Sequence, residues 1–169
     1  MKKLLVVIDM QNDFVFGALG SKEAVAILPA VKEEIEKAKS AGITLVFTRD
    51  THGEDYLATR EGKNLPIPHC LKNTEGWQIV QGLYSGELVF DKPTFGSELL
   101  AAFVKEEGFE EVTLLGVCTD ICVVSNALLI KAKCPEAAVK LVEKACAGVT
   151  PASHAAAVQT LRSCQVEII

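Results

Sequence analysis

Residues 3–8 read Lys-Leu-Leu-Val-Val-Ile and are followed by Asp9. A continuous apolar run with β-branched residues implies burial on both faces, as in a strand of a parallel sheet. The preceding Met1-Lys2-Lys3 gives the start of the chain some likeness to a signal peptide, but Asp9 interrupts the apolar run and no small-residue cleavage site follows. The segment therefore predicts a buried strand with a carboxylate at its carboxyl end.

Apolar runs and amphipathic stretches alternate along the rest of the chain. Ser21 suits a helix N-cap, and apolar residues follow it at helical spacing as far as Ser40-Ala41-Gly42. Further strands are predicted at residues 43–48, 88–90, 112–115, 138–142 and 166–169, and further helices at residues 97–107, 120–131 and 151–163. This alternation indicates an α/β fold with a doubly wound, mostly parallel sheet and helices on both faces. No linker or repeat divides the chain, so we expect a single domain over residues 1–169.

Composition and charge exclude several classes of protein. The 169 residues are 49% hydrophobic and 23% charged, which is typical of a globular protein and not of a disordered chain. The net charge of -5 disfavours nucleic-acid binding, and no apolar run approaches the roughly 18 residues of a membrane helix. We therefore expect no nucleic-acid or membrane partner and a cytoplasmic location. In that compartment the six cysteines would be reduced thiols, most of them buried.

Three reactive side chains occur at or just after predicted strand ends. Ligands of doubly wound sheets bind beyond the carboxyl ends of the strands, where Asp9 and Lys92 are expected. Cys122 follows a strand and a tight turn, and Thr119 or Asp120 would cap the helix that begins there. Free backbone N–H groups and the helix dipole would make the thiol more acidic, and the same N–H groups could hold an oxyanion.

Together these side chains suit nucleophilic catalysis. Asp9 could take the proton of the thiol and return it to a leaving group, while Lys92 would favour the ionised forms of both partners. Taken singly, each residue has a plain structural alternative. Asp9 could cap a helix, Lys92 could be solvated, and Cys122 could pack against the sheet like Cys134 or Cys146.

A second cluster has the donor atoms of a metal site. It lies at the start of, and within, an irregular stretch of residues 51–75, and a loop that long in a compact domain is usually functional. The candidate ligands are Asp50, His52 and His69, with Glu54 or Glu61 in a fourth position. Carboxylate and imidazole ligands suit zinc, iron or manganese. The alternative is a pair of loop histidines beside acidic neighbours, and His154 is interpreted as structural or exposed.

Five stretches, in this order, resemble isochorismatase-like cysteine hydrolases: residues 6–14 (Val-Val-Ile-Asp-Met-Gln-Asn-Asp-Phe), 48–52 (Thr-Arg-Asp-Thr-His), 68–70 (Pro-His-Cys), 92–97 (Lys-Pro-Thr-Phe-Gly-Ser) and 116–123 (Gly-Val-Cys-Thr-Asp-Ile-Cys-Val). The resemblance covers nearly the whole chain. It implies a six-stranded parallel sheet of order 3-2-1-4-5-6 and a catalytic triad of Asp9, Lys92 and Cys122. It also implies a cis peptide bond between Val117 and Cys118, which would turn the N–H groups of Cys118 and Cys122 toward the substrate carbonyl oxygen.

Within this family the sequence resembles the nicotinamidase branch, whose members have both the cysteine and a metal cluster. Asp50, His52 and His69 match the metal ligands of that branch, and Glu61 lies close to the position of an extra glutamate ligand. Phe14 matches an aromatic residue that stacks on a pyridine ring. In such enzymes the metal binds the ring nitrogen, directly or through water, and so orients the substrate.

Two features depart from that branch. Residues 65–68 (Leu-Pro-Ile-Pro) stand where nicotinamidases commonly place an aromatic residue before the metal histidine, so one wall of the ring pocket would be aliphatic. The chain is also short for the family, so an insertion that shapes some pockets is expected to be missing. Members are often dimers or tetramers, and the resemblance therefore implies a homo-oligomer.

The sequence thus predicts a cysteine-dependent amidohydrolase. It would cleave a small, nicotinamide-like carboxamide to acid and ammonia through a thioester, with a divalent metal as cofactor, zinc ahead of iron or manganese. One alternative is a different small amide, or a metal-bound water as the nucleophile with Cys122 as a bystander. A second alternative is a non-catalytic binding protein on the same fold, because fold alone does not give function.

Overall fold

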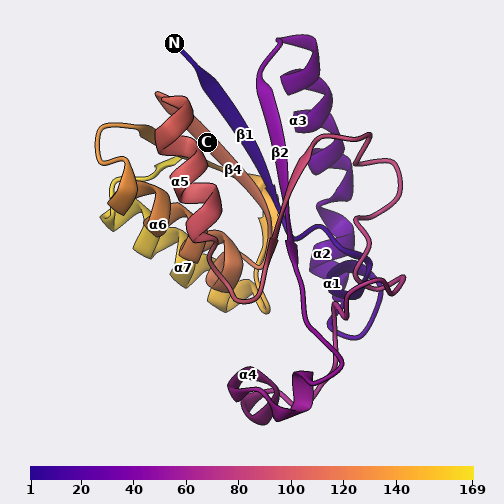
Figure 1. Ribbon diagram of the computed structural model, residues 1–169. Helices are drawn as coiled ribbons and strands as arrows, with labels where there is room; N and C mark the ends of the chain where they lie inside the picture. The colour runs from indigo at the N-terminus through magenta and orange to yellow at the C-terminus, as the bar shows by residue number, and fades with distance from the viewer.

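The computed structural model describes residues 1–169 and contains one six-stranded, all-parallel sheet of order β3-β2-β1-β4-β5-β6. The strands are β1 (Lys3–Ile8), β2 (Thr44–Asp50), β3 (Leu88–Lys92), β4 (Glu111–Val117), β5 (Ala138–Ala147) and β6 (Glu167–Ile168). Helices cover both faces of this sheet (Figure 1). The predicted fold class and strand order are therefore confirmed.

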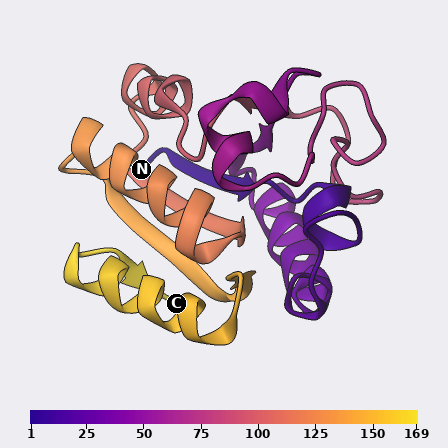
Figure 2. The same cartoon turned by 90° about the horizontal axis from the view of Figure 1, so that it is seen from below.

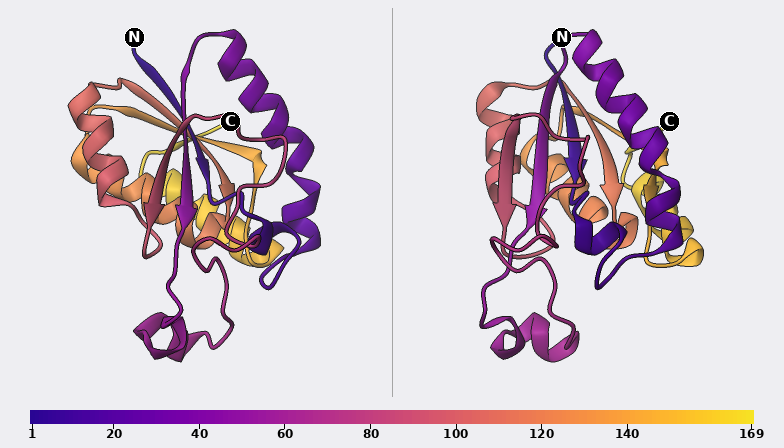
Figure 3. Two further views of the ribbon diagram at one scale, coloured as in Figure 1. Left: turned by 45° about the vertical axis from the view of Figure 1, so that its right-hand side comes forward. Right: turned by 90° about the vertical axis from the view of Figure 1, so that its right-hand side faces the viewer.

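The helices divide into two groups, one on each face of the sheet. They are α1 (Asn12–Val15), α2 (Lys22–Ala26), α3 (Leu28–Ser40), α4 (Arg60–Asn64), α5 (Glu98–Glu107), α6 (Val124–Lys133) and α7 (Pro151–Ser163). In Figure 1, α5, α6 and α7 lie on the opposite side of the sheet from α1, α2 and α3, and Figure 2 shows α6 and α7 side by side from below. Helix α4 belongs to neither group, because it projects beyond the carboxyl ends of the strands in both views of Figure 3.

The position of β1 explains its continuous apolar sequence. It lies between β2 and β4, and residues 6–8 have no solvent-exposed surface because helices cover both faces. The chain leaves β1 toward β2 and β3, then returns to β4 on the other side of β1. The carboxyl ends of β1 and β4 therefore flank the point where strand order reverses, which is the usual ligand site of such sheets.

The single helix expected after Ser21 is divided in two by the structure. The Ser21 hydroxyl accepts the N–H of Ala24 and caps α2, as predicted, but α2 ends at Ala26. A second helix, α3, begins at Leu28 with Pro29 in its first turn. Proline has no N–H to donate and its ring crowds the carbonyl of the preceding turn, so the first helix cannot run through Pro29.

Several other helices and strands also differ from the elements predicted from the sequence. The irregular stretch 51–75 contains a 3-10 helix, η1 (Tyr56–Ala58), and α4, which the Thr59 hydroxyl caps by accepting the N–H of Gly62. The helix expected from Asp120 begins as a π-helical turn, η2 (Thr119–Val123), before α6. Strand β5 is longer than predicted, and β6 is shorter. No disulfide joins the six cysteines, and no helix combines the length and apolar character needed to cross a membrane.

Candidate active site

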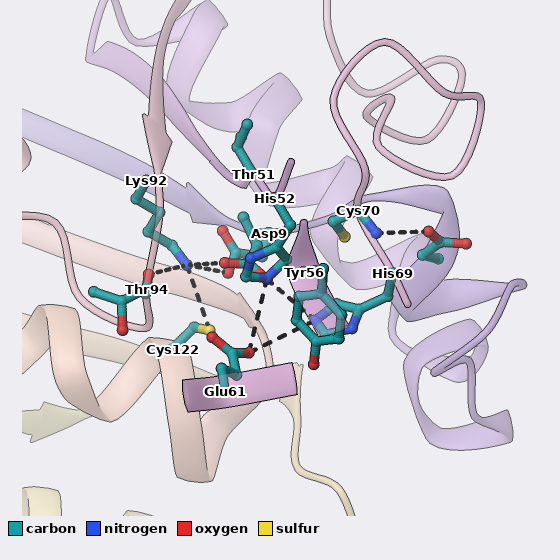
Figure 4. A network of polar contacts seen from close by, with 12 residues as sticks. Asp9, Thr51, His52, Tyr56, Glu61, His69, Cys70, Lys92, Thr94 and Cys122 are labelled. Atoms are coloured by element: carbon teal, nitrogen blue, oxygen red, sulfur yellow. Dashed lines mark hydrogen bonds and ion pairs between the residues drawn. The ribbon is translucent and has the colours of Figure 1, made fainter. Parts of the chain in front are cut away.

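Asp9, Lys92 and Cys122 converge at the carboxyl edge of the sheet, as the sequence predicted. Asp9 follows β1, Lys92 ends β3, and Cys122 lies in η2 after β4. The Lys92 Nζ atom is 2.6 Å from Asp9 Oδ2 and 3.5 Å from Cys122 Sγ, so the ammonium lies between the carboxylate and the sulfur (Figure 4). Lys92 also donates to the carbonyl of Thr94 at 3.1 Å. All three side chains of the triad are buried.

Asp9 is held by its backbone and by a neighbouring strand. Its φ of 47° lies in the left-handed region, which residues other than glycine seldom occupy and which is concentrated at functional sites. Thr48, on β2, donates its hydroxyl to Asp9 Oδ1 at 2.6 Å and accepts the Asp9 N–H at 3.2 Å. One carboxylate oxygen therefore contacts Thr48, and the other contacts Lys92.

Burial and neighbouring charges set the protonation of the triad. Burial, and then the charge of Asp9, raises the pKa of the Cys122 thiol well above its ordinary value, and Lys92 only partly offsets this. Burial also raises the pKa of the Asp9 carboxyl against the pull of the Lys92 ammonium. Burial disfavours that ammonium, but the charges around it outweigh burial and raise the pKa of Lys92. The sequence analysis expected the helix position to lower the pKa of this thiol, and that prediction is wrong for the free protein.

The turn between β4 and α6 presents Cys118 and Cys122 from one short segment. The Val117–Cys118 peptide bond is cis, as the family resemblance implies. The carbonyl of Cys118 accepts the N–H groups of Ile121 and Val123 at 3.1 Å. The backbone N–H of Cys118 donates no hydrogen bond to another backbone group. That N–H is available to a substrate oxygen.

Neither Thr119 nor Asp120 caps the helix at this turn, which corrects the sequence prediction. Cys118 is the N-cap residue, and no side chain bonds to the turn's free N–H groups. The physical reason is that both candidate caps have other partners. The Thr119 hydroxyl pairs with His154 at 2.8 Å, and Asp120 Oδ1 accepts the N–H of Val149 at 3.0 Å.

The predicted metal ligands form one compact cluster beside the triad. Asp50 Oδ2 is 2.8 Å from His52 Nε2 and 3.4 Å from His69 Nε2, and Glu61 Oε1 is 3.8 Å from both imidazole nitrogens. One ligand atom from each residue lies within 4.8 Å of all the others. Glu61, on α4, is thus the fourth candidate, whereas Glu54 is exposed and outside the cluster.

The donor set fits a divalent cation. His69 Nδ1 contacts the carbonyl of Ile67 at 2.8 Å, so Nε2 is the ring nitrogen that faces Asp50, and the Nε2 lone pair would bind an ion when the ring is neutral. Asp50 Oδ1 is buried without a hydrogen-bond partner, 3.6 Å from the Lys92 ammonium, so Oδ2 is the oxygen that faces the two imidazoles. Burial disfavours the Asp50 carboxylate, but hydrogen bonds from the two histidines and the charge of Lys92 hold its pKa well below its usual range. Two imidazoles and two carboxylates are the ligand types that zinc, iron and manganese accept.

Two residues without a predicted role support this cluster. Gln11 is fully buried; its side-chain amide donates to the carbonyl of Asp50 and accepts the Asp50 N–H, at 2.9 and 2.8 Å. Tyr56 packs its ring against both imidazoles, with centroid distances of 4.8 Å to His52 and 5.1 Å to His69. Gln11 lies in the stretch that carried the family resemblance, but glutamine is usually exposed, so only the fold reveals its contacts.

Of the remaining predicted residues, Phe14 and Ile67 contact His69, whereas His154 contacts Thr119. Phe14, on α1, is mostly buried, and its ring centroid is 5.5 Å from that of His69. The side chain of Ile67, in the aliphatic stretch before His69, is exposed. His154 was interpreted as structural or exposed; it is partly buried and contacts Thr119 behind η2.

Comparisons with known proteins show the family and the fold of this chain. The family model described as the isochorismatase domain matches residues 3–169. The structure of a pyrazinamidase from Pyrococcus horikoshii in complex with zinc superposes with a TM-score of 0.88 at 31% identity, covering 100% of this chain and 99% of that one. A nicotinamidase/pyrazinamidase of Mycobacterium tuberculosis is 26% identical, covering 99% of this chain and 98% of the relative. An Arabidopsis thaliana relative, named as a probable inactive nicotinamidase, is 28% identical, covering 96% and 89%.

Proposed function

Because this chain belongs to the isochorismatase family, we propose that it hydrolyses a small, nicotinamide-like carboxamide to the carboxylic acid and ammonia, with Cys122 as the nucleophile. One observation carries the proposal: Lys92 Nζ lies between Asp9 Oδ2, at 2.6 Å, and Cys122 Sγ, at 3.5 Å. A thiol, a base and a cation in contact supply the parts that nucleophilic acyl transfer needs. A pyrazinamidase and a nicotinamidase/pyrazinamidase among its relatives support the choice of substrate.

The first half of the reaction forms a thioester. Asp9 takes the proton of the Cys122 thiol as sulfur attacks the amide carbon, and the carbonyl oxygen becomes an oxyanion held by the N–H groups of Cys118 and Cys122. Burial raises the pKa of the Asp9 carboxyl, so Asp9 is a stronger proton acceptor than a solvent-exposed carboxylate. When the C–N bond breaks, Asp9 returns the proton to nitrogen and ammonia leaves.

The second half releases the acid. A water molecule gives its proton to Asp9 as its oxygen attacks the thioester carbon, and the C–S bond breaks. The sulfur leaves as a thiolate that regains the proton from Asp9, which restores the starting state. Lys92 stabilises the carboxylate and the thiolate in turn, because it contacts both.

The metal cluster would hold the far end of the substrate. Asp50, His52, Glu61 and His69 would bind the ion. When bound, a divalent ion supplies a Lewis-acid contact for a ring nitrogen, directly or through water. Phe14, beside His69, would stack on the ring. We extend the proposal to zinc as the ion, which the carboxylate and imidazole ligands suit, and to a cytoplasmic location. The family resemblance adds a homo-oligomer to the proposal.

An ammonia-release assay tests the proposal. Nicotinamide, pyrazinamide and other small amides are compared with and without added zinc, iron or manganese, using wild type, Cys122→Ala and, as the matched control, Cys134→Ala. We expect turnover in wild type and Cys134→Ala, and a loss of at least about 1000-fold in folded Cys122→Ala. Unchanged turnover in Cys122→Ala would show that Cys122 is not the nucleophile and would favour attack by a metal-bound water. If the wild type hydrolyses none of the amides, the result would favour a non-catalytic binding protein. The Arabidopsis thaliana relative is likewise named as a probable inactive nicotinamidase.

A further inference from the structure

The hydroxyl of Thr119 makes one side-chain contact, and it lies in a distant part of the chain. Thr119 is fully buried, and its Oγ1 atom is 2.8 Å from Nδ1 of His154, 35 residues later. His154 belongs to the first turns of α7 and is partly buried. The contact therefore joins η2, which carries the nucleophile, to the helix that follows β5.

A second contact joins the same two segments. Asp120 Oδ1 accepts the N–H of Val149, at 3.0 Å, in the connection between β5 and α7. Gly148 permits this close approach, because a Cβ atom there would lie 2.9 Å from Asp120 Oδ1 and 2.8 Å from the backbone nitrogen of His154. The connection therefore packs directly behind η2, with no room for a larger residue at Gly148.

The location of Thr119 gives the contact a consequence for the reaction. Thr119 directly follows Cys118 and precedes Cys122 by three residues, and no side chain caps this turn. Rotation of the Thr119 backbone would move the Cys118 N–H and the sulfur together. A displacement of about 1 Å in such groups can cost about 100-fold in rate.

We propose that His154 is a positioning residue, which fixes the Cys118 N–H and the Cys122 sulfur by holding the hydroxyl of Thr119. This inference rests on the proposed amidase function. The Nε2 atom of His154 is 3.8 Å from Glu143 Oε1, so the carboxylate favours a proton on Nε2. Nδ1 then accepts a hydrogen bond from the Thr119 hydroxyl.

Paired substitutions test the contact from both sides. Thr119→Val removes the hydroxyl and keeps the shape, whereas Thr119→Ser keeps the hydroxyl. His154→Leu removes the acceptor, whereas His154→Asn keeps a polar atom at the position of Nδ1. Thr160→Val is the matched control, because the hydroxyl of Thr160 bonds within the exposed face of α7.

We expect Thr119→Val and His154→Leu each to lower kcat by about tenfold or more, with KM changed by less than about threefold. The double variant should have a kcat little lower than that of either single variant, because the two substitutions remove the same hydrogen bond. Thr119→Ser and His154→Asn should recover most of kcat, and Thr160→Val should equal wild type. A purely structural contact would lower the melting temperature and leave kcat unchanged well below it, which would overturn the proposal, as would additive effects.

Amide hydrogen exchange of residues 117–123 gives a readout that needs no substrate. Exchange should be faster in Thr119→Val and His154→Leu than in wild type, His154→Asn or Thr160→Val. If wild type hydrolyses no amide, the proposed function fails, while this measurement still shows whether His154 holds the turn. Equal exchange in all variants would overturn the positioning role. If His154→Leu does not fold, the Thr119→Val and Thr119→Ser pair decides alone.

Discussion

At the scale of single residues, the site depends on how Asp9 acts on Cys122. Asp9 has one effect on the thiol of Cys122 in the free protein and the opposite effect in the proposed reaction. In the free protein the Asp9 charge adds to burial in raising the pKa of the thiol, so it keeps the sulfur protonated. In the proposed reaction the same carboxylate receives the proton of the thiol during attack. In the proposed mechanism, the carboxylate whose charge opposes thiolate formation in the free protein would therefore also be the base that activates the thiol when a carbonyl is present.

Replacing Asp9 should separate these two effects. In Asp9→Asn the thiol loses a nearby negative charge while the Lys92 ammonium remains, so the pKa of Cys122 falls and more thiolate exists at a given pH. We expect faster alkylation of Cys122 by iodoacetamide at pH 8, and ammonia release lower by at least about 100-fold because the general base is gone. Both rates are measured on one preparation.

The matched control for this charge change is Asp91→Asn. Asp91 pairs with Arg49 at 2.7 Å, next to Lys92 in sequence but outside the triad, so both rates should stay near wild type. Slower alkylation in Asp9→Asn would show that Asp9 already activates the thiol without substrate. It would contradict the inference that the Asp9 charge raises the pKa of Cys122.

Gln11 makes a second prediction at this scale. In Gln11→Leu the N–H and carbonyl of Asp50 and the carbonyl of Trp77 lose their buried partner. Each unpaired group costs about 1–3 kcal/mol, and partial relaxation should leave a loss of about 2–4 kcal/mol in the free energy of unfolding. Zinc affinity should fall as well, because Asp50 is a candidate ligand. Denaturant unfolding and a zinc titration measure the two effects, with exposed Gln78→Leu as control; equal stability of the two variants would contradict the role.

At the scale of elements, η1 and α4 bring Glu61 to the cluster. Gly62 lies against η1, where a Cβ atom would overlap the carbonyl oxygen of Tyr56. The Tyr56 hydroxyl donates to the carbonyl of Leu65 at 2.8 Å and closes the segment around α4. The position of Glu61 thus depends on the close packing of two very short helices.

Gly62→Ala should displace α4 and weaken metal binding. The added methyl group cannot fit beside the Tyr56 carbonyl, so Glu61 should move away from the two imidazoles. We expect zinc affinity to fall by about tenfold or more, as for loss of a supporting contact in other metal sites. Gly53→Ala, in the same loop, is the control, because its methyl group would meet only the exposed Asp55 side chain. Equal zinc titrations for both variants would exclude this role for α4.

The elements also show why sequence patterns predicted some structure and missed the rest. Strand β1 and helix α7 have the predicted bounds, because their signals are local: an apolar run, and Thr150 with Pro151 at a helix start. The π-helical turn was missed because Thr119 and Asp120, both good caps, bond to residues about 30 positions away. Local propensity cannot report such contacts.

At the scale of the whole molecule, the parallel sheet explains how much of the site was predictable. Asp9, Asp50 and Lys92 follow or end three adjacent strands, so strand ends alone placed them at one edge. Gln11 was given no role because its importance lies in a contact with Asp50, 39 residues later. The protonation of Cys122 was mispredicted for a related reason, since it depends on burial by the complete fold.

Metal binding at the cluster would be coupled to the stability of the whole molecule. Its donors come from the end of β2, α4 and the loop at His69, and they meet only in the folded state. An ion that binds only the folded state stabilises it by about 2.7 kcal/mol at 100 times its dissociation constant. In a domain of this size we expect zinc to raise the melting temperature by about 5–10 °C.

Histidine substitutions locate that effect. The chain has three histidines, two of them in the cluster, so His52→Gln should lose most of the zinc-dependent rise while His154→Gln keeps it. Scanning calorimetry with a reducing agent present, with and without zinc, measures both shifts while the six cysteines stay reduced. A rise that survives in His52→Gln would place the ion elsewhere, on thiols in the first instance, because they are the other strong zinc donors in the chain. A rise that disappears only in His52→Gln would show that the ion binds at the edge of the sheet, beside the nucleophile.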